Sequence, residues 1–198
     1  AAQAVELNGK TYAGGSAEIR SAEELVNRQS LAARERIVLE AAHIDNAGVI
    51  EAGVEPDERR NARGDLELRS GTLRNAGSLV ASRALEAKAS QALDNQGGSL
   101  KGATVRVDAG HLDNRGGKIV GDSGLGITAP HVLNQDKGVL ASRDGLRLSA
   151  TELFNGAGGL LSSQKGIDVS LAGAFDNQAG SLDSRGFLTV KSAWLDNQ

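Results

Sequence analysis

The feature that most constrains the fold is a short motif that recurs about every 20 residues along the chain. An apolar residue, Asp and Asn occur in this order, as in Leu93-Asp94-Asn95 and Leu112-Asp113-Asn114, and looser copies keep the Asn. Successive motif Asn residues are 19–22 residues apart, except for one step of 29 residues between Asn46 and Asn75. A period of this length indicates a solenoid, in which each repeat buries its apolar face only against its neighbours.

Each repeat also contains short stretches in which apolar and polar residues alternate, such as Leu146-Arg147-Leu148. Alternation with a period of two predicts strands with one buried face, and the Gly and Asn residues between them predict tight turns. These turns leave no room for crossover helices, so stacked repeats pair equivalent strands in parallel. The sequence therefore predicts an all-β fold, a parallel β-helix (solenoid) with coils of about 20 residues. The side chains expected to point inward are Leu146, Leu148, Ile167, Val169, Leu188 and Val190, with Arg147, Asp168 and Thr189 pointing outward.

Residues 16–42 allow a second interpretation, because they are rich in Ala, Glu and Arg, which favour helices. The Asn period nevertheless continues through Asn27, and Ile37-Val38-Leu39 stands where the alternating strand belongs. We therefore expect β-coils here as well, so that residues 1–198 form one continuous repeat segment.

Composition and charge exclude several classes of protein. The formal net charge of −3 argues against a nucleic-acid binder, which needs a basic face. No apolar run approaches about 18 residues, so no membrane-spanning segment is predicted. The chain has no Cys, which excludes disulfides and Cys-ligated metal sites. It also has no Met, even at position 1, so we expect a piece excised from a longer shaft.

The motif Asn residues are expected to share one turn corner of the stack. A side-chain amide both donates and accepts hydrogen bonds, so a column of Asn residues can form a ladder along the coils. We prefer this structural role to ligand binding. The expected ladder comprises Asn46, Asn75, Asn95, Asn114, Asn134, Asn155, Asn177 and Asn197.

The single long step adds about ten residues to one repeat, and we place this insertion at residues 53–63. Its charged residues and Pro56 predict a loop at the surface of the shaft. Insertions in repeat proteins often bind partners, although chains also tolerate insertions that have no function. The candidate partner-binding residues are Glu55, Asp57, Arg59 and Arg60.

The motif Asp residues raise the question of catalysis, because Asp94 and Asp113 should lie one coil apart, near the separation of a catalytic carboxylate pair. Catalytic carboxylates need distinct environments, whereas these belong to the repeat itself, so we interpret them as solvent-facing turn residues. No phosphate-binding loop, nucleophile elbow or His-Glu-x-x-His motif is present. The sequence thus predicts no catalytic residue and no cofactor. The alternative is a β-helical enzyme that acts on polysaccharide.

His43, His111 and His131 each precede a motif Asn by three residues. His111 and His131 should therefore stack on adjacent coils, with Glu152 next in the column. Metal binding and pH sensing both require such proximity. The equivalent positions elsewhere hold Ala, Thr and Trp, which favours an exposed column without a fixed role. No metal ligand is assigned, and the calcium-binding pattern Gly-Gly-x-Gly-x-Asp is missing.

Repeats that read Leu-Asp-Asn-x-Gly-Gly and continue into an apolar strand resemble those of filamentous haemagglutinins. Residues 93–98 and 112–117 carry this motif in phase, and the resemblance extends over nearly the whole chain. It implies a right-handed β-helix in a large exoprotein that is secreted or displayed at the surface of a Gram-negative bacterium. The family includes filamentous adhesins and contact-dependent growth inhibition effectors, in which the shaft carries a receptor-binding region and a C-terminal toxin.

The resemblance also implies partners and a role. An outer-membrane two-partner secretion transporter would export the chain, and a receptor on a host or neighbouring cell would be its target. The lack of Cys suits a chain that crosses a membrane unfolded. We therefore expect a structural shaft segment that acts in cell contact, in adhesion, virulence or toxin delivery, and not an enzyme.

Overall fold

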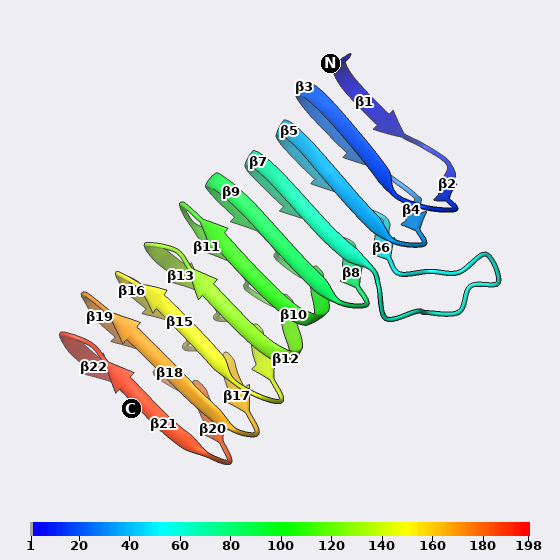
Figure 1. The fold of residues 1–198 in the computed structure, drawn as a ribbon. Coiled ribbons are helices and arrows are strands. Elements are labelled where there is room, and N and C mark those ends of the chain that lie inside the picture. The colour runs from blue at the N-terminus through cyan, green and yellow to red at the C-terminus, as the bar shows by residue number, and fades with distance from the viewer. Residues whose placement is uncertain (1) are drawn as a thin grey trace.

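The computed structural model describes residues 2–198, and every regular element in that range is a β-strand. The strands stack along one axis, with the N-terminal coil at one end and the C-terminal coil at the other (Figure 1). Within residues 2–198 the chain forms about ten coils, which at about 4.8 Å per coil correspond to a rod of about 40–45 Å. All pairings between named strands are parallel, as between β10 (Ser99–Ala109) and β12 (Lys118–Thr128). The expectation of an all-β parallel β-helix is therefore confirmed.

Three faces surround the core, and each coil contributes a strand to each face except at the ends of the stack. The first face consists of short strands in which the second residue is usually a fully buried Leu or Ile, such as Leu79 and Leu140. It contains β2 (Lys10–Ala13), β4 (Ser30–Ala33), β6 (Val49–Ala52), β8 (Ser78–Ala81), the first parts of β10 (Ser99–Ala109) and β12 (Lys118–Thr128), β14 (Val139–Ser142), β17 (Leu160–Ser163) and β20 (Ser181–Ser184).

The second face carries the alternating stretches seen in the sequence. It contains the first parts of β3 (Ala17–Asn27), β5 (Arg36–Asn46), β7 (Asp65–Asn75) and β9 (Ala84–Asp94), the second parts of β10 and β12, and then β15 (Leu146–Ala150), β18 (Gly166–Leu171) and β21 (Phe187–Lys191).

The third face ends at the motif Asn of each coil. It contains β1 (Ala2–Leu7), the second parts of β3, β5, β7 and β9, and then β11 (Leu112–Asp113), β13 (His131–Leu133), β16 (Glu152–Phe154), β19 (Ala174–Asp176) and β22 (Trp194–Asp196).

The helical interpretation of residues 16–42 is wrong. This segment forms β3, β4 and the start of β5, because its Leu and Ile residues occur at positions that pair in register with the next coils. Leu25 and Leu31 are fully buried in the same core as the later repeats. Burial along the shared core thus overrides the local helix propensity of Ala, Glu and Arg.

The core follows the expected register over most of the second face. The apolar residues Leu146, Leu148, Ile167 and Val169 are buried. Arg147, which lies between Leu146 and Leu148, is exposed. Leu188 differs from the expectation, because 51% of it is exposed. Its strand, β21, pairs with β18 on one side only, so the second neighbour that would bury Leu188 is missing within the described residues. Val190 is half-buried for the same reason.

Candidate functional site

A column of Asn side chains runs along the corner that follows the third face. The Nδ2 group of Asn95 donates to Oδ1 of Asn114 at 2.7 Å, and Asn114 donates in turn to Asn134 at 2.7 Å. The same Nδ2 group of Asn114 lies 3.3 Å from the carbonyl oxygen of Gly117 in its own turn. The donor thus always belongs to the preceding coil. The residues in this series are Asn27, Asn46, Asn75, Asn95, Asn114, Asn134, Asn155, Asn177 and Asn197.

The N-terminal end of this column differs from the residues selected on sequence. Asn27 belongs to the column, because its Nδ2 donates to Asn46 Oδ1 at 2.7 Å. Asn8 has the right spacing, but it is exposed and its amide donates to Glu6 at 3.0 Å. As a result, Asn27 Oδ1 is buried without a hydrogen-bond partner. The 19-residue spacing predicts that Asn27 belongs to the column. It predicts the same for Asn8, which does not join it.

The Asp before the Asn shapes the turn that follows. Asp94 Oδ1 accepts a hydrogen bond from the backbone N–H of Gln96 at 3.0 Å, and Asp176 Oδ1 does so from Gln178 at 3.0 Å. Asp side chains commonly bind the backbone two residues on in this way and so stabilise a turn. Asp94 and Asp113 do pair in register. Because both serve their own turns, they give little support to a catalytic carboxylate pair.

Asp113 is enclosed, so a solvent-facing position is wrong for this residue. Its side chain is only 10% exposed, and the Arg115 guanidinium covers it with Nη2 2.6 Å from Oδ2. Burial acts to raise the pKa of the Asp113 carboxyl. Hydrogen bonds from the side chain and backbone of Arg115 outweigh burial, so the pKa lies below its ordinary value. Asp113 is therefore a charged group held inside the turn.

The Gly residues after the Asn let neighbouring coils approach closely at this corner. A Cβ atom on Gly117 would collide with the carbonyl oxygen of Asn95 and lie 2.7 Å from Asn114 Oδ1. Gly124, in the same coil, has open space at its Cβ position.

We therefore expect Gly117→Ala to lower the free energy of unfolding by about 1–3 kcal/mol, as overpacking does. The matched change Gly124→Ala should alter it by less than about 0.5 kcal/mol. Thermal or urea melts of the two variants measure the difference. Equal destabilisation would contradict the close approach at Gly117.

Residues 53–64 leave the stack between β6 and β7 as a protruding loop (Figure 1). The loop is anchored at its base, where Val54 is buried and its carbonyl oxygen accepts a hydrogen bond from Tyr12 Oη at 3.1 Å. Asn61 Nδ2 donates to the carbonyl oxygen of Arg34 at 2.8 Å. An isolated antiparallel bridge joins Val54 to Arg60. These contacts tie the insertion to the first coils.

The structure separates the four candidate loop residues into two groups. Glu55 is half-buried at the base, where it forms an ion pair with Arg34 at 2.8 Å. Asp57 and Arg59 lie at the tip, paired with each other at 2.7 Å and largely exposed. Arg60 is exposed and reaches back to Glu51 on β6 at 2.5 Å. Asp57, Arg59 and Arg60 are thus open to a partner, whereas Glu55 faces the shaft.

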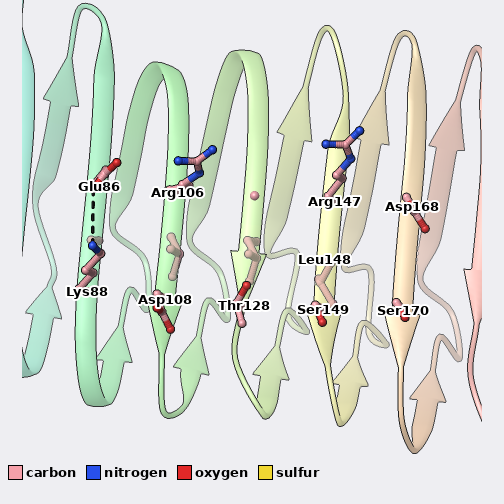
Figure 2. Close-up of a pocket in the computed structure, with 14 residues that line it drawn as sticks. Glu86, Lys88, Arg106, Asp108, Thr128, Arg147, Leu148, Ser149, Asp168 and Ser170 are labelled. Carbon is pink, nitrogen blue, oxygen red and sulfur yellow. Dashed lines mark ion pairs between the residues drawn. The ribbon is translucent and has the colours of Figure 1, made fainter.

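A shallow hollow of about 410 Å³ lies on the outer side of the second face. Figure 2 shows Arg106 on β10 and Arg147 on β15, on either side of β12. Between them Gly126 contributes no side chain. Neither arginine forms an ion pair within residues 2–198, whereas Lys88 lies 3.8 Å from Glu86 at one end. This surface was not predicted from the sequence, although Arg106, Gly126 and Arg147 occupy one outward position of three successive repeats.

The three histidines lie along the outer side of the third face. His43 Nδ1 is 2.7 Å from Thr72 Oγ1 of the next coil. The rings of His111 and His131 are 6.3 Å apart, and His131 Nδ1 is 3.1 Å from Glu152 Oε2. Within residues 2–198, no three His, Asp or Glu side chains gather around one ion position. The same residues also include no helix with the length and apolar character needed to cross a bilayer.

Comparison with known proteins identifies the family to which the repeat belongs. No curated protein and no solved structure matches the chain. A family model described as the haemagglutinin repeat matches residues 5–56, 61–116 and 102–198, so the matches extend over almost all of the sequence. The break between the first two matches lies in the protruding loop. Repeats of this family with this β-helical shape support a structural shaft of adhesin type. The chain belongs to the haemagglutinin repeat family.

Proposed function

We propose that this chain is a shaft segment of a large exoprotein, secreted or displayed by a Gram-negative bacterium, that acts in contact between cells. Its export passes through an outer-membrane two-partner secretion transporter, and its role is adhesion or contact-dependent toxin delivery. The family match and the repeat-built rod support this proposal. The observation that carries it is the continuous apolar core, which runs from Leu25 to Phe175 through the stacked repeats.

We further propose that the loop of residues 53–63 is the contact that this segment offers to a receptor on a host or neighbouring cell. The loop is the one interruption of the repeat spacing. Its base is held by Tyr12 and Arg34, so its tip is presented in a defined position. A fixed loop loses less conformational entropy on binding than a free one. Asp57 and Arg59 at the tip supply charges of both signs.

The experiment uses beads coated with the whole chain, mixed with epithelial cells or with bacteria and counted by flow cytometry. The test variant combines Asp57→Asn with Arg59→Gln. The control combines Asp183→Asn with Arg185→Gln, which changes the same residue types at the same spacing on exposed positions of the last coil. We expect the tip variant to reduce bead binding at least about fivefold, the effect of losing about 1 kcal/mol of contact energy.

The control variant should bind as the unchanged chain does. Equal losses in the two variants would contradict the role of the loop while leaving an adhesive shaft in place. Failure of the unchanged chain to bind either kind of cell above uncoated beads would contradict a contact role for this segment. Circular dichroism melts of all three proteins show whether the substitutions leave the fold intact.

A further inference from the structure

His111 and His131 present two imidazole rings at the same position of adjacent coils on the third face. The residues after them, Leu112 and Val132, pair in register and are fully buried. His131 is exposed and His111 is half-buried, and both lie on the outer side of this face. Their ring centroids are 6.3 Å apart, with 41° between the ring planes. Bonds from a metal ion to imidazole nitrogen are about 2.0–2.1 Å long, so rotation of the two side chains about their χ angles is needed to bring one nitrogen of each ring to a shared ion.

Glu152 determines which nitrogen of His131 is available. Its Oε2 lies 3.1 Å from His131 Nδ1, and the two residues pair in register between β13 and β16. An ionised carboxylate only accepts hydrogen bonds, so Nδ1 carries the proton of the neutral ring, and the Nε2 lone pair of that form is left for a metal ion. A carboxylate that binds the second nitrogen of a ligating histidine is a recurrent feature of protein metal sites, where it fixes the ring and raises its basicity.

The surroundings leave the site open on its other side. The preceding position in the column is Ala92, whose small side chain offers no donor and no obstacle. Asp113, two residues after His111, forms an ion pair with Arg115 and accepts a hydrogen bond from the backbone of its own turn. Two imidazole nitrogens are therefore the protein ligands, and water completes the coordination.

We propose that His111 and His131 form a surface site for a divalent transition-metal ion, with Glu152 as the residue that positions His131. Imidazole ligands suit Cu²⁺, Ni²⁺ and Zn²⁺, and the general order of affinities places Cu²⁺ first. The site does not depend on the proposed role in cell contact. A bound ion would join two adjacent coils through their side chains and so stabilise the stack.

The test is titration of the tag-free chain with Cu²⁺ by calorimetry in a non-coordinating buffer at pH 7.5, together with electron paramagnetic resonance of the bound ion. We expect one Cu²⁺ per chain with nitrogen coupling from two imidazoles. His111→Gln and His131→Gln should each weaken binding at least about tenfold, and Glu152→Ala should weaken it by about 10–100-fold, the usual effect of losing a residue that orients a ligand.

His43→Gln is the matched control, because His43 lies in the same column but faces Glu24 and Thr72 instead of a second imidazole. It should bind Cu²⁺ as the unchanged chain does. A double variant without His111 and His131 that binds Cu²⁺ within about twofold of the unchanged chain would overturn the proposal. An equal loss in His43→Gln would do the same, because it would show unspecific binding to histidine. None of the substituted side chains lies in the apolar core, so melts without metal should change little.

Discussion

Leu148→Asp is expected to lower the free energy of unfolding by about 3–5 kcal/mol, because it places an unpaired carboxylate in the core of the β-helix. Leu148 is only 2% exposed. Its strand pairs in register with β12 on one side and β18 on the other, where the facing residues are Ile127 and Val169. Both of these are buried apolar residues, so no neighbour in the core could pair with the new charge. Denaturant unfolding followed by circular dichroism measures the loss.

Arg147→Asp is the control for this prediction, because it introduces the same residue one position earlier. Arg147 is exposed on the outer side of β15 and forms no ion pair within residues 2–198. Surface substitutions of this kind usually change stability by less than about 1 kcal/mol. If Leu148→Asp and Arg147→Asp melted at the same temperature, the register of the second face would be wrong.

The period of the motif was sufficient to predict the fold, because in a solenoid the same contacts recur in every coil. Leu79 and Leu140 occupy equivalent positions and are equally buried. Hydrophobic alternation therefore identified the buried side of each strand without knowledge of any single contact. The prediction failed for Leu188, where one neighbouring strand is missing from the described residues, because burial in a repeat protein depends on a neighbour on each side.

The candidate surfaces were harder to predict, because they depend on side chains that do not recur. Nothing in the spacing shows that Arg115 closes over Asp113, or that Tyr12 and Arg34 hold the base of a loop that begins some 20–40 residues later. The hollow beside Arg106 arises because Gly126 lacks a side chain in the next coil. The repeat period predicts which residues occupy equivalent positions in successive coils. It does not predict which side chains at different positions contact one another.

Asn114→Leu is expected to lower the free energy of unfolding by about 1–3 kcal/mol, the usual cost of leaving buried polar groups without partners. Asn114 is fully buried, accepts a hydrogen bond from Asn95 at 2.7 Å and donates one to Asn134 at 2.7 Å. Leu at this position would remove both bonds. It would leave the Nδ2 group of Asn95 and the Oδ1 atom of Asn134 without this partner inside the corner, where water cannot replace it.

The identical substitution Asn197→Leu provides the comparison, since side-chain size and propensity are then the same in both variants. Asn197 is exposed and accepts a hydrogen bond from Asn177, but it donates none to another coil within the described residues. This change removes one hydrogen bond of the column instead of two, so its effect should be below that of Asn114→Leu. Urea melts of the two variants give the comparison. Equal changes in stability would show that the hydrogen bonds between Asn residues of different coils add nothing to the stability of the turns. The β-helical fold would not be contradicted by that result.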